Sequence, residues 1–446
     1  MTGLIVEEIT VMDQYVRPAL SRRRFLTAAG AALAGTALLS GCSSGARPGA
    51  TLVREWNLFS GGDGQRHVSM QDTFRQRTPG TALQATVLPW GAPFYTKLAM
   101  AAAGGRGPDL ATMHLSRLPG FSPATLLDPY PSDLLAEYGI TQDKFLPEVW
   151  NRCAVDGQVY AVPLDTHMIV HYYNTEICGQ AGLIGADGKL VSPRGPDELL
   201  EQLRAVKEVT GNFGASLEAE QPWRFFASLY AQMGGEMIDA NGTRVLLDVD
   251  RATEALELLR RLAIDEQLIP GSADYPATVA LFGGGQAGMS FNGEWEVTTY
   301  VDAELPFGMA QMPDVYGSRL ALGDSHTYVL PKQAVRDPEV LRATVEFIAA
   351  MLEDSLEWAK GGHVPAYQPV ARSAQYAALR PQSEYAASAG AVAFDPPGWF
   401  SGSGSTLETV ANDALGSVMT GALQPQAAAA QLKTALQRLV SIPSPV

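Results

Sequence analysis

The side chains best suited to proton transfer or metal binding in this sequence are its six histidines. They are His67, His114, His167, His171, His326 and His363. His167 and His171 are four residues apart, a spacing that would put both on one face of a helix and within reach of one metal ion. The segment 168–174 has the composition of a strand, however, where residues four apart share a face but lie well separated. We therefore expect ordinary hydrogen-bonded histidines and no metal site.

Motifs that identify common enzyme classes are absent from the sequence. It contains no HExxH, GxSxG or GxxxxGK[ST] pattern, which would indicate a zinc protease, a serine hydrolase or a phosphate-binding loop. The glycine-rich stretch 283–288 lacks the lysine and the preceding strand of a phosphate loop, so it predicts a turn between a helix and a strand. We expect neither catalysis nor a cofactor. The alternative left open is an exported carbohydrate-active enzyme in which Asp165 and Glu294 form a carboxylate pair.

Seven tryptophans offer flat apolar surfaces that could stack on a sugar ring. Trp56 lies in a strand-like segment and Trp358 at the end of a helical stripe, so both are expected in the core. Three others lie in turn-like segments: Trp90, Trp295 and Trp399. A large ring in a loop either covers a local core or contacts a ligand. The functional interpretation is stacking on a sugar whose hydroxyls bond nearby carboxylates, histidines and amides.

The N-terminus has the parts of an export signal. A twin-arginine pattern occupies 21–26, and an alanine-rich apolar run follows over 25–39. That run is shorter than the ~20 residues that a membrane-spanning helix needs. Residues 39–42 resemble a bacterial lipobox, which implies cleavage before Cys42 and acylation of its thiol.

We therefore expect a signal peptide over 1–41, a lipid on Cys42 and a flexible tether over 42–50. An uncleaved anchor is the alternative. The residues ahead of the arginines leave open a start codon downstream of Met1.

Composition limits the remaining possibilities. The 446 residues carry 32 Lys and Arg against 47 Asp and Glu, a net charge of -15, which argues against a nucleic-acid partner. A hydrophobic content of 46% predicts a globular body. Only three cysteines are present. If Cys42 carries the lipid, Cys153 and Cys178 either form a disulfide or remain two buried thiols, and the sequence leaves both open.

The elements that must position these groups alternate between strand and helix. The expected order is strand 52–59, helix 65–77, strand 82–88, helix 94–103 and strand 109–113. This alternation predicts an open, largely parallel sheet with helices on its faces. Ligands of such sheets bind at the carboxyl ends of strands, where the glycine loop after Phe59 and His114 both lie. Further along we expect a strand over 168–174 and helices over 196–210, 252–264, from 337 onward, and twice within 406–440.

Four segments, in order along the chain, resemble one protein family. The segment 104–110 resembles its "GxxPDV" strand, and 155–164 running into 172–175 resembles its "DGKxYGVP…YYNK" crossing. The segment 281–295 resembles "FxxGKAAMxxxGxW", with Gln286 in place of the lysine, and 362–366 resembles "GxxPA". The chain is thus similar to family 1 of the extracellular solute-binding proteins of ABC importers, the maltose- and multiple-sugar-binding type.

The resemblance implies an α/β fold of type II periplasmic-binding-protein kind. It has two discontinuous lobes, each a mostly parallel sheet flanked by helices, with a ligand cleft between them. We expect lobe 1 over 51–163 plus 326–380, and lobe 2 over 164–325 plus 381–446. Crossings are expected near Leu164-Asp165, near 325–328 and within 375–395.

The resemblance also implies positions for the ligand site. The first lobe would contribute Asp63, Trp90, His114 and His363. The second would contribute Trp223, Glu294 and Trp295, with Asp165 and His167 beside the crossing. Trp295 would be the stacking surface, the carboxylates would accept bonds from hydroxyls, and the histidines would donate or accept.

The implied function is that of the extracytoplasmic solute-binding component of an ABC importer. A monomer, lipid-anchored at the outer face of the cytoplasmic membrane, would bind a sugar or oligosaccharide by hinge closure and deliver it to the permease subunits. The alternatives are the exported carbohydrate-active enzyme and a binding protein for a non-sugar solute, such as a peptide, polyamine, metal or phosphodiester.

Overall fold

The computed structural model describes residues 49–121, 123 and 125–445. The expected signal peptide and Cys42 lie outside these residues. Within them, no helix combines the length and the apolar character needed to cross a bilayer. The architecture below belongs to the compact unit Arg47–Val446.

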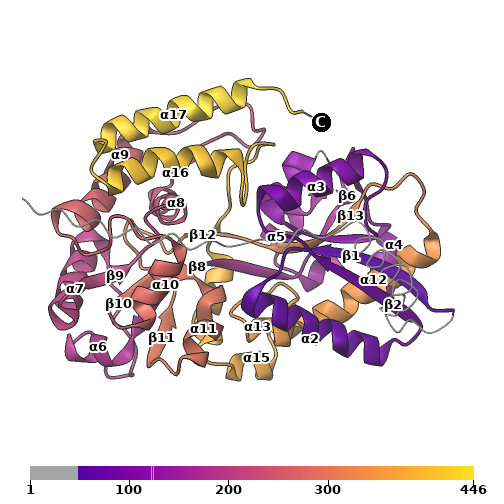
Figure 1. Ribbon diagram of the computed structural model, residues 1–446, viewed down its shortest axis with the longest axis horizontal. Helices are drawn as coiled ribbons and strands as arrows, with labels where there is room; N and C mark the ends of the chain where they lie inside the picture. The colour runs from indigo at the N-terminus through magenta and orange to yellow at the C-terminus, as the bar shows by residue number, and fades with distance from the viewer. Residues whose placement is uncertain (1–48, 122, 124, 446) are drawn as a thin grey trace, which may run out of the picture. The chain divides into compact units, whose positions relative to one another are not determined.

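The first sheet follows the expected alternation closely. Strands β1 (Thr51–Asn57), β2 (Thr81–Val87) and β3 (Leu110–His114) pair in parallel, in the order β2-β1-β3. Helices α2 (Gly61–Arg77) and α3 (Ala92–Ala103) connect these strands, and Figure 1 shows them on opposite sides of the sheet. Three further strands complete the sheet: β4 (Leu127–Asp128), β7 (Ala161–Pro163) and β13 (His326–Pro331).

The second sheet is built on the long strand β8 (Asp165–Asn174), every residue of which is buried. Its strand order is β15-β12-β8-β10-β9, with β11 and β14 also paired to β8. The bounds are β9 (Phe213–Ser216), β10 (Ala287–Gly293), β11 (Phe307–Ala310), β12 (Ala321–Asp324), β14 (Val364–Pro365) and β15 (Val392–Ala393). We call the bodies around the two sheets the first lobe and the second lobe.

Helices cover both lobes, and their sequences explain where they begin and which face they bury. In α12 (Pro338–Glu353) of the first lobe, the Asp337 side chain accepts a hydrogen bond from the Glu339 amide as N-cap. Its stripe of Val345, Ile348 and Leu352 is buried, as expected. The remaining long helices belong to the second lobe: α7 (Gly195–Thr210), α8 (Trp223–Gln232), α9 (Val249–Arg260), α10 (Tyr275–Gly283), α16 (Thr406–Met419) and α17 (Pro425–Ser441).

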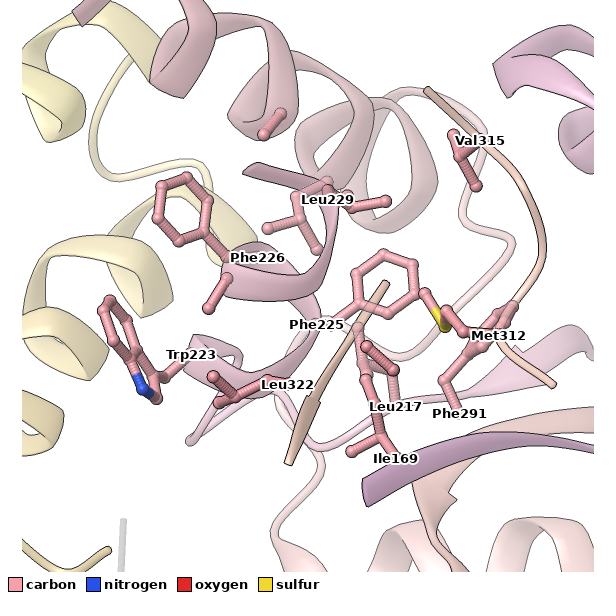
Figure 2. Close-up of a cluster of buried hydrophobic side chains, with 14 of the residues drawn as sticks. Ile169, Leu217, Trp223, Phe225, Phe226, Leu229, Phe291, Met312, Val315 and Leu322 are labelled. Atoms are coloured by element: carbon pink, nitrogen blue, oxygen red, sulfur yellow. The ribbon is translucent and has the colours of Figure 1, made fainter. Parts of the chain in front are cut away.

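The core of the second lobe is aromatic where α8 packs on its sheet. Phe225 points toward Phe291 of β10, with 4.9 Å between ring centroids, whereas Trp223 and Phe226 point toward the C-terminal helices (Figure 2). The Trp223 amide donates to the Asn412 side chain of α16 at 3.0 Å. Helix α8 therefore joins the sheet to the C-terminal helices, which Figure 1 draws in yellow.

The chain passes between the lobes at two adjacent points. Leu164 alone separates β7 of the first sheet from β8 of the second, and Ser325 alone separates β12 from β13. The Leu164 amide donates to the His326 carbonyl at 2.8 Å, and the Ser325 hydroxyl donates to the Asp165 carbonyl at 2.6 Å. The crossing strands β8 and β13 run antiparallel to every strand they pair with. Antiparallel pairs therefore outnumber parallel ones in both sheets, and the expectation that each sheet is mostly parallel is wrong.

A third connection brings the chain back to the second sheet at β14, whose residues pair with Asp165 and Thr166. This pairing precedes the 375–395 region in which a crossing was expected. The lobe bounds given above stay a prediction.

The structure shows free thiols at both remaining cysteines, so the possible disulfide between Cys153 and Cys178 is wrong. Cys153 lies in the hydrophobic core of the first lobe and Cys178 in that of the second. Burial raises the pKa of the Cys178 thiol to about 12 and also raises that of Cys153. Both behave as small apolar side chains rather than as reactive thiols.

Candidate functional site

A cavity of about 590 Å³ is lined by residues of both lobes. Its first-lobe wall includes the loop after β1, with Phe59 and Asp63, and His114 at the carboxyl end of β3. Its second-lobe wall includes Trp295, two residues after the end of β10, and the start of α8. The cavity therefore lies where the carboxyl ends of strands meet, the place at which α/β sheets bind ligands. Its volume is that of a small-molecule site.

Two tryptophans from opposite lobes line the cavity. Trp90, in the loop between β2 and α3, is 42% exposed. Trp295 is held in place, because its indole N–H donates to the Tyr275 hydroxyl at 2.6 Å. A Cβ on Gly293 would lie 2.0 Å from the Trp295 ring, so only glycine lets the indole lie against the end of β10. The face of an indole is apolar and can stack on a flat apolar surface such as that of a sugar ring.

Trp223 is part of the cavity wall, but its ring is almost completely buried. It lines the cavity, yet it is only 1% exposed. Its indole N–H donates to Asp395 Oδ1 at 3.0 Å. Burial raises the pKa of Asp395 to about 7.

One arginine lies in the otherwise acidic second-lobe wall. The Arg224 guanidinium is 3.7 Å from Glu218 and 3.4 Å from Glu408, and its centre lies 5.8 Å from the Trp295 ring centroid. Burial raises the pKa of Glu218 to about 7. The wall therefore combines a cation, carboxylates and an aromatic face, a set of groups that can bond the hydroxyls of a polar ligand.

The floor of the cavity is a buried cluster of histidines around one carboxylate. Asp165 Oδ1 lies 3.0 Å from His167 Nδ1, and Asp165 Oδ2 lies 2.7 Å from His326 Nδ1. Burial favours the neutral acid, but His326 and His167 hold the pKa of Asp165 well below its usual value. Asp165 itself is fully buried and is not among the cavity-lining residues.

His363 links this cluster to the first-lobe wall. Its Nε2 lies 3.0 Å from Asp63 Oδ1. Burial alone would lower the pKa of His363, but Asp63 and Glu294 hold it well above its usual value. The preceding Gly362 has φ +115°, and a Cβ there would lie 2.0 Å from the Glu294 carbonyl oxygen. A glycine is therefore needed for this segment to approach β10.

Glu294 faces inward, like Asp165. It is fully buried, and its Oε2 accepts a hydrogen bond from the Met168 amide at 2.8 Å. Burial raises the pKa of Glu294 despite its neighbour His363. Neither Glu294 nor Asp165 is among the residues that line the cavity.

The structure thus brings the nine expected site residues to one region but gives them two positions. Seven line the cavity: Asp63, Trp90, His114, His167, Trp223, Trp295 and His363. Asp165 and Glu294 lie beneath them, and the role of all nine in binding stays a prediction. His171, which shares a face of β8 with His167, stacks on Phe291 in the core, with 4.6 Å between ring centroids. Trp399 is absent from the cavity lining and donates to the Ile442 carbonyl at 3.1 Å.

Several cavity residues gave no usable signal in the sequence. Arg224 and Tyr275 both contact the Trp295 side chain, although they lie 71 and 20 residues before it in the sequence. The sequence shows that His326 is a histidine, but its partner Asp165 lies 161 residues away.

Four residues of the cavity floor could hold a metal ion, because one ligand atom of each lies within 4.8 Å of the others: Asp165, His167, His326 and His363.

Comparison with known proteins gives partial matches among curated relatives. The chain is 30% identical over 168 residues to an arabinooligosaccharide-binding protein of Halalkalibacterium halodurans, covering 37% of this chain and 35% of that one. It is 27% identical over 223 residues to a maltotriose-binding protein of Pyrococcus abyssi, covering 49% of this chain and 44% of that one. The matches therefore span less than half the length of these relatives.

Solved structures agree over a larger part of the chain. The maltose-bound MalE3 structure of T. maritima superposes with a TM-score of 0.74 at 18% identity, covering 87% of this chain and 100% of that one. At this identity the agreement establishes the two-lobed fold. The family model described as bacterial extracellular solute-binding protein matches residues 65–355. The chain therefore belongs to the bacterial extracellular solute-binding protein family.

Proposed function

We propose that this protein is the extracytoplasmic solute-binding component of an ABC importer and that its ligand is an oligosaccharide. The observation that carries the proposal is the pair Trp90 and Trp295, which line one cavity from opposite lobes. A sugar presents apolar faces to stack on such rings and a rim of hydroxyls for the carboxylates, histidines and Arg224 between them.

The relatives support the same class of ligand. By their names, the curated relatives bind arabinooligosaccharide and maltotriose, and the similar solved structure holds maltose. A cavity of about 590 Å³ has room for a short oligosaccharide rather than only a monosaccharide. We therefore place two to four sugar units, roughly, in this cleft.

Binding would proceed by hinge closure. Only Leu164 and Ser325 separate the crossing strands from their partners in the other lobe, so small dihedral changes there can rotate one lobe against the other. A ligand that contacts Trp90 and Trp295 together binds the closed state more tightly and shifts the population toward it. The closed form would then dock on the permease. This cycle requires no covalent chemistry, and the inward orientation of Asp165 and Glu294 does not favour the enzyme alternative.

The cellular setting belongs to the same proposal. Export through the twin-arginine signal and acylation of Cys42 would hold a monomeric binding protein at the outer face of the cytoplasmic membrane. The tether over 42–50 would let it reach the permease.

A thermal-shift screen tests the proposed ligand. Full-length protein is heated with maltose, maltotriose, an arabinooligosaccharide, glucose, spermidine and a tripeptide. A ligand that binds only the folded state raises the melting temperature with concentration. We expect the oligosaccharides to raise it, without any release of shorter sugars on prolonged incubation. A rise with spermidine or the tripeptide alone would favour a non-sugar ligand, and release of shorter sugars would favour the enzyme.

A further inference from the structure

Three histidines direct ring nitrogens at one buried carboxylate. The distances from the Asp165 carboxylate to Nδ1 are 3.0 Å for His167, 2.7 Å for His326 and 3.6 Å for His363. The four residues come from the starts of β8 and β13 and from the residue just before β14. All four are buried. Three chain segments that meet at the crossing therefore place four potential metal ligands around one point.

The His363 ring has a nitrogen that ordinary hydrogen bonding leaves unused. Among the residues that the structure describes, His363 Nδ1 is fully buried and has no hydrogen-bond partner. It faces Asp165 Oδ2 at 3.6 Å and Glu294 Oε1 at 3.5 Å, and Glu294 Oε1 also lacks a partner. A protonated imidazole beside a carboxylate would close this gap to about 2.7–2.9 Å. The longer spacing is that of two ligands on either side of an ion.

The surroundings of His363 match those of a metal ligand. Its other ring nitrogen, Nε2, lies 3.0 Å from the Asp63 carboxylate. Metal-binding histidines commonly bond a carboxylate through the nitrogen that faces away from the metal, which fixes the ring orientation. The Trp358 ring stacks on His363 at 4.6 Å with an interplanar angle of 9°, and its N–H donates to Asp165 Oδ2 at 2.7 Å. Both the histidine and the carboxylate are thus held rigidly.

We propose that Asp165, His167, His326 and His363 form a binding site for a divalent transition-metal ion of the Zn²⁺ class beneath the cleft. Three imidazoles and one carboxylate are a common tetrahedral donor set for zinc. With bonds of about 2.0–2.1 Å, neighbouring ligand atoms of a tetrahedron lie about 3.3 Å apart. The four ligand atoms lie within 4.8 Å of one another, so small side-chain movements would bring them onto one ion. The ion would fix the two crossing strands to the segment before β14.

This inference does not depend on the oligosaccharide proposal. His171 is the matched control, because it is a buried histidine of the same strand that stacks on Phe291 outside the cluster. The full-length protein is stripped with a chelator, dialysed and titrated with Zn²⁺ by calorimetry and with Co²⁺ by visible absorption. We expect one ion per chain, the visible bands of tetrahedral Co²⁺, and a melting temperature that rises with Zn²⁺. His363→Gln and His167→Gln should each weaken Zn²⁺ binding by about a hundredfold or more, whereas His171→Gln should not change it.

Two results would overturn the site: no stoichiometric Zn²⁺ uptake by the stripped protein, or equal uptake by the parent and by both cluster variants. Circular dichroism of each variant separates loss of binding from loss of folding. If one glutamine variant fails to fold, the other variant and the Co²⁺ spectrum of the parent protein still show whether the site binds metal. Maltotriose titration of the stripped protein separates the two proposals. If maltotriose does not bind, the Zn²⁺ result is unaffected, and if Zn²⁺ does not bind, the maltotriose result is unaffected.

Discussion

The Trp295 indole donates a hydrogen bond of 2.6 Å to the Tyr275 hydroxyl, which in turn donates to Glu296. This chain of hydrogen bonds fixes the Trp295 ring in the cavity lining. A ring that is already ordered loses little conformational entropy when a ligand stacks on it. The pair therefore prepares a rigid stacking surface on the second lobe.

Trp295→Ala should weaken oligosaccharide binding by about tenfold or more, the loss typical of an aromatic residue at the centre of an interface. Calorimetric titration measures this loss. Trp399→Ala is the control, since Trp399 lies outside the cavity lining and should leave affinity unchanged. Full affinity in Trp295→Ala would remove Trp295 from the site.

Tyr275→Phe should have a smaller effect of the same sign. The variant keeps the ring of residue 275 but loses the hydroxyl that orients Trp295. We expect affinity to fall by roughly threefold, within the range of one lost neutral hydrogen bond. An unchanged dissociation constant would show that packing against Gly293 alone fixes the indole.

Trp90→Ala tests the first-lobe wall. Because the Trp90 side chain is 42% exposed, its removal should change stability by less than about 1 kcal/mol. Affinity should fall about tenfold, since closure would lose its contact on this lobe. The measurements are urea unfolding and calorimetric titration on one preparation. A loss of stability with unchanged affinity would make Trp90 a cover for the local core.

Arg224→Gln should destabilise the second lobe. Its guanidinium lies between Glu218 and Glu408, and the exposed fractions of these three side chains are 22%, 10% and 9%. Removing the cation leaves two poorly solvated carboxylates, at a cost of about 1–3 kcal/mol after allowance for the partial exposure. Arg261→Gln is the matched control, because its pair with Glu266 is more exposed and should cost below about 1 kcal/mol. Equal effects on the urea midpoint would contradict this prediction.

Stability should fall as pH rises from about 6.5 to 8 because of Glu55 on β1. Burial raises the pKa of this carboxyl to about 8. The folded protein then holds a proton that the unfolded chain has already released, so the free energy of unfolding decreases as pH rises through this window. The buried neighbour His67 opposes this trend at the acid end of the window, because burial lowers its pKa to about 3 and near pH 6.5 only the unfolded chain still holds a proton on this imidazole. Glu55→Gln should flatten the slope, measured by urea unfolding at pH 6.5 and pH 8.

The slope should not vanish in Glu55→Gln. Burial also raises the pKa values of Glu218 and Asp395 to about 7, and these groups contribute with the same sign at the lower end of the window. An unchanged slope in Glu55→Gln would show that Glu55 is ionised in the folded protein.

Local patterns predicted the elements of this fold well. The alternation from Thr51 to His114, the N-cap Asp337 and the turn after α10 depend on neighbouring residues, and the structure confirms them. The positions of His114 and of the loop after Phe59 at strand ends followed from the same alternation. A periodic pattern of apolar residues shows which face of a helix or strand is buried, and this is sufficient to predict the type and order of the elements.

The orientation of polar groups depended on partners distant in sequence and could not be predicted in this way. Asp165 turns inward because His326, 161 residues away, and Trp358, 193 residues away, bond its carboxylate. Glu294 turns inward because the Met168 amide, 126 residues away, requires an acceptor. The two cysteines flank adjacent strands in sequence, but the crossing at Leu164 sends these strands into different lobes.

Calorimetric titration of maltotriose into the parent protein and into a Trp90→Ala/Trp295→Ala double variant tests the central claim most directly. One oligosaccharide held between the lobes predicts binding of one maltotriose per parent chain and an affinity loss of about a hundredfold in the double variant. Either of two results would contradict the claim: the absence of binding of any oligosaccharide to the parent, or the same dissociation constant in both proteins.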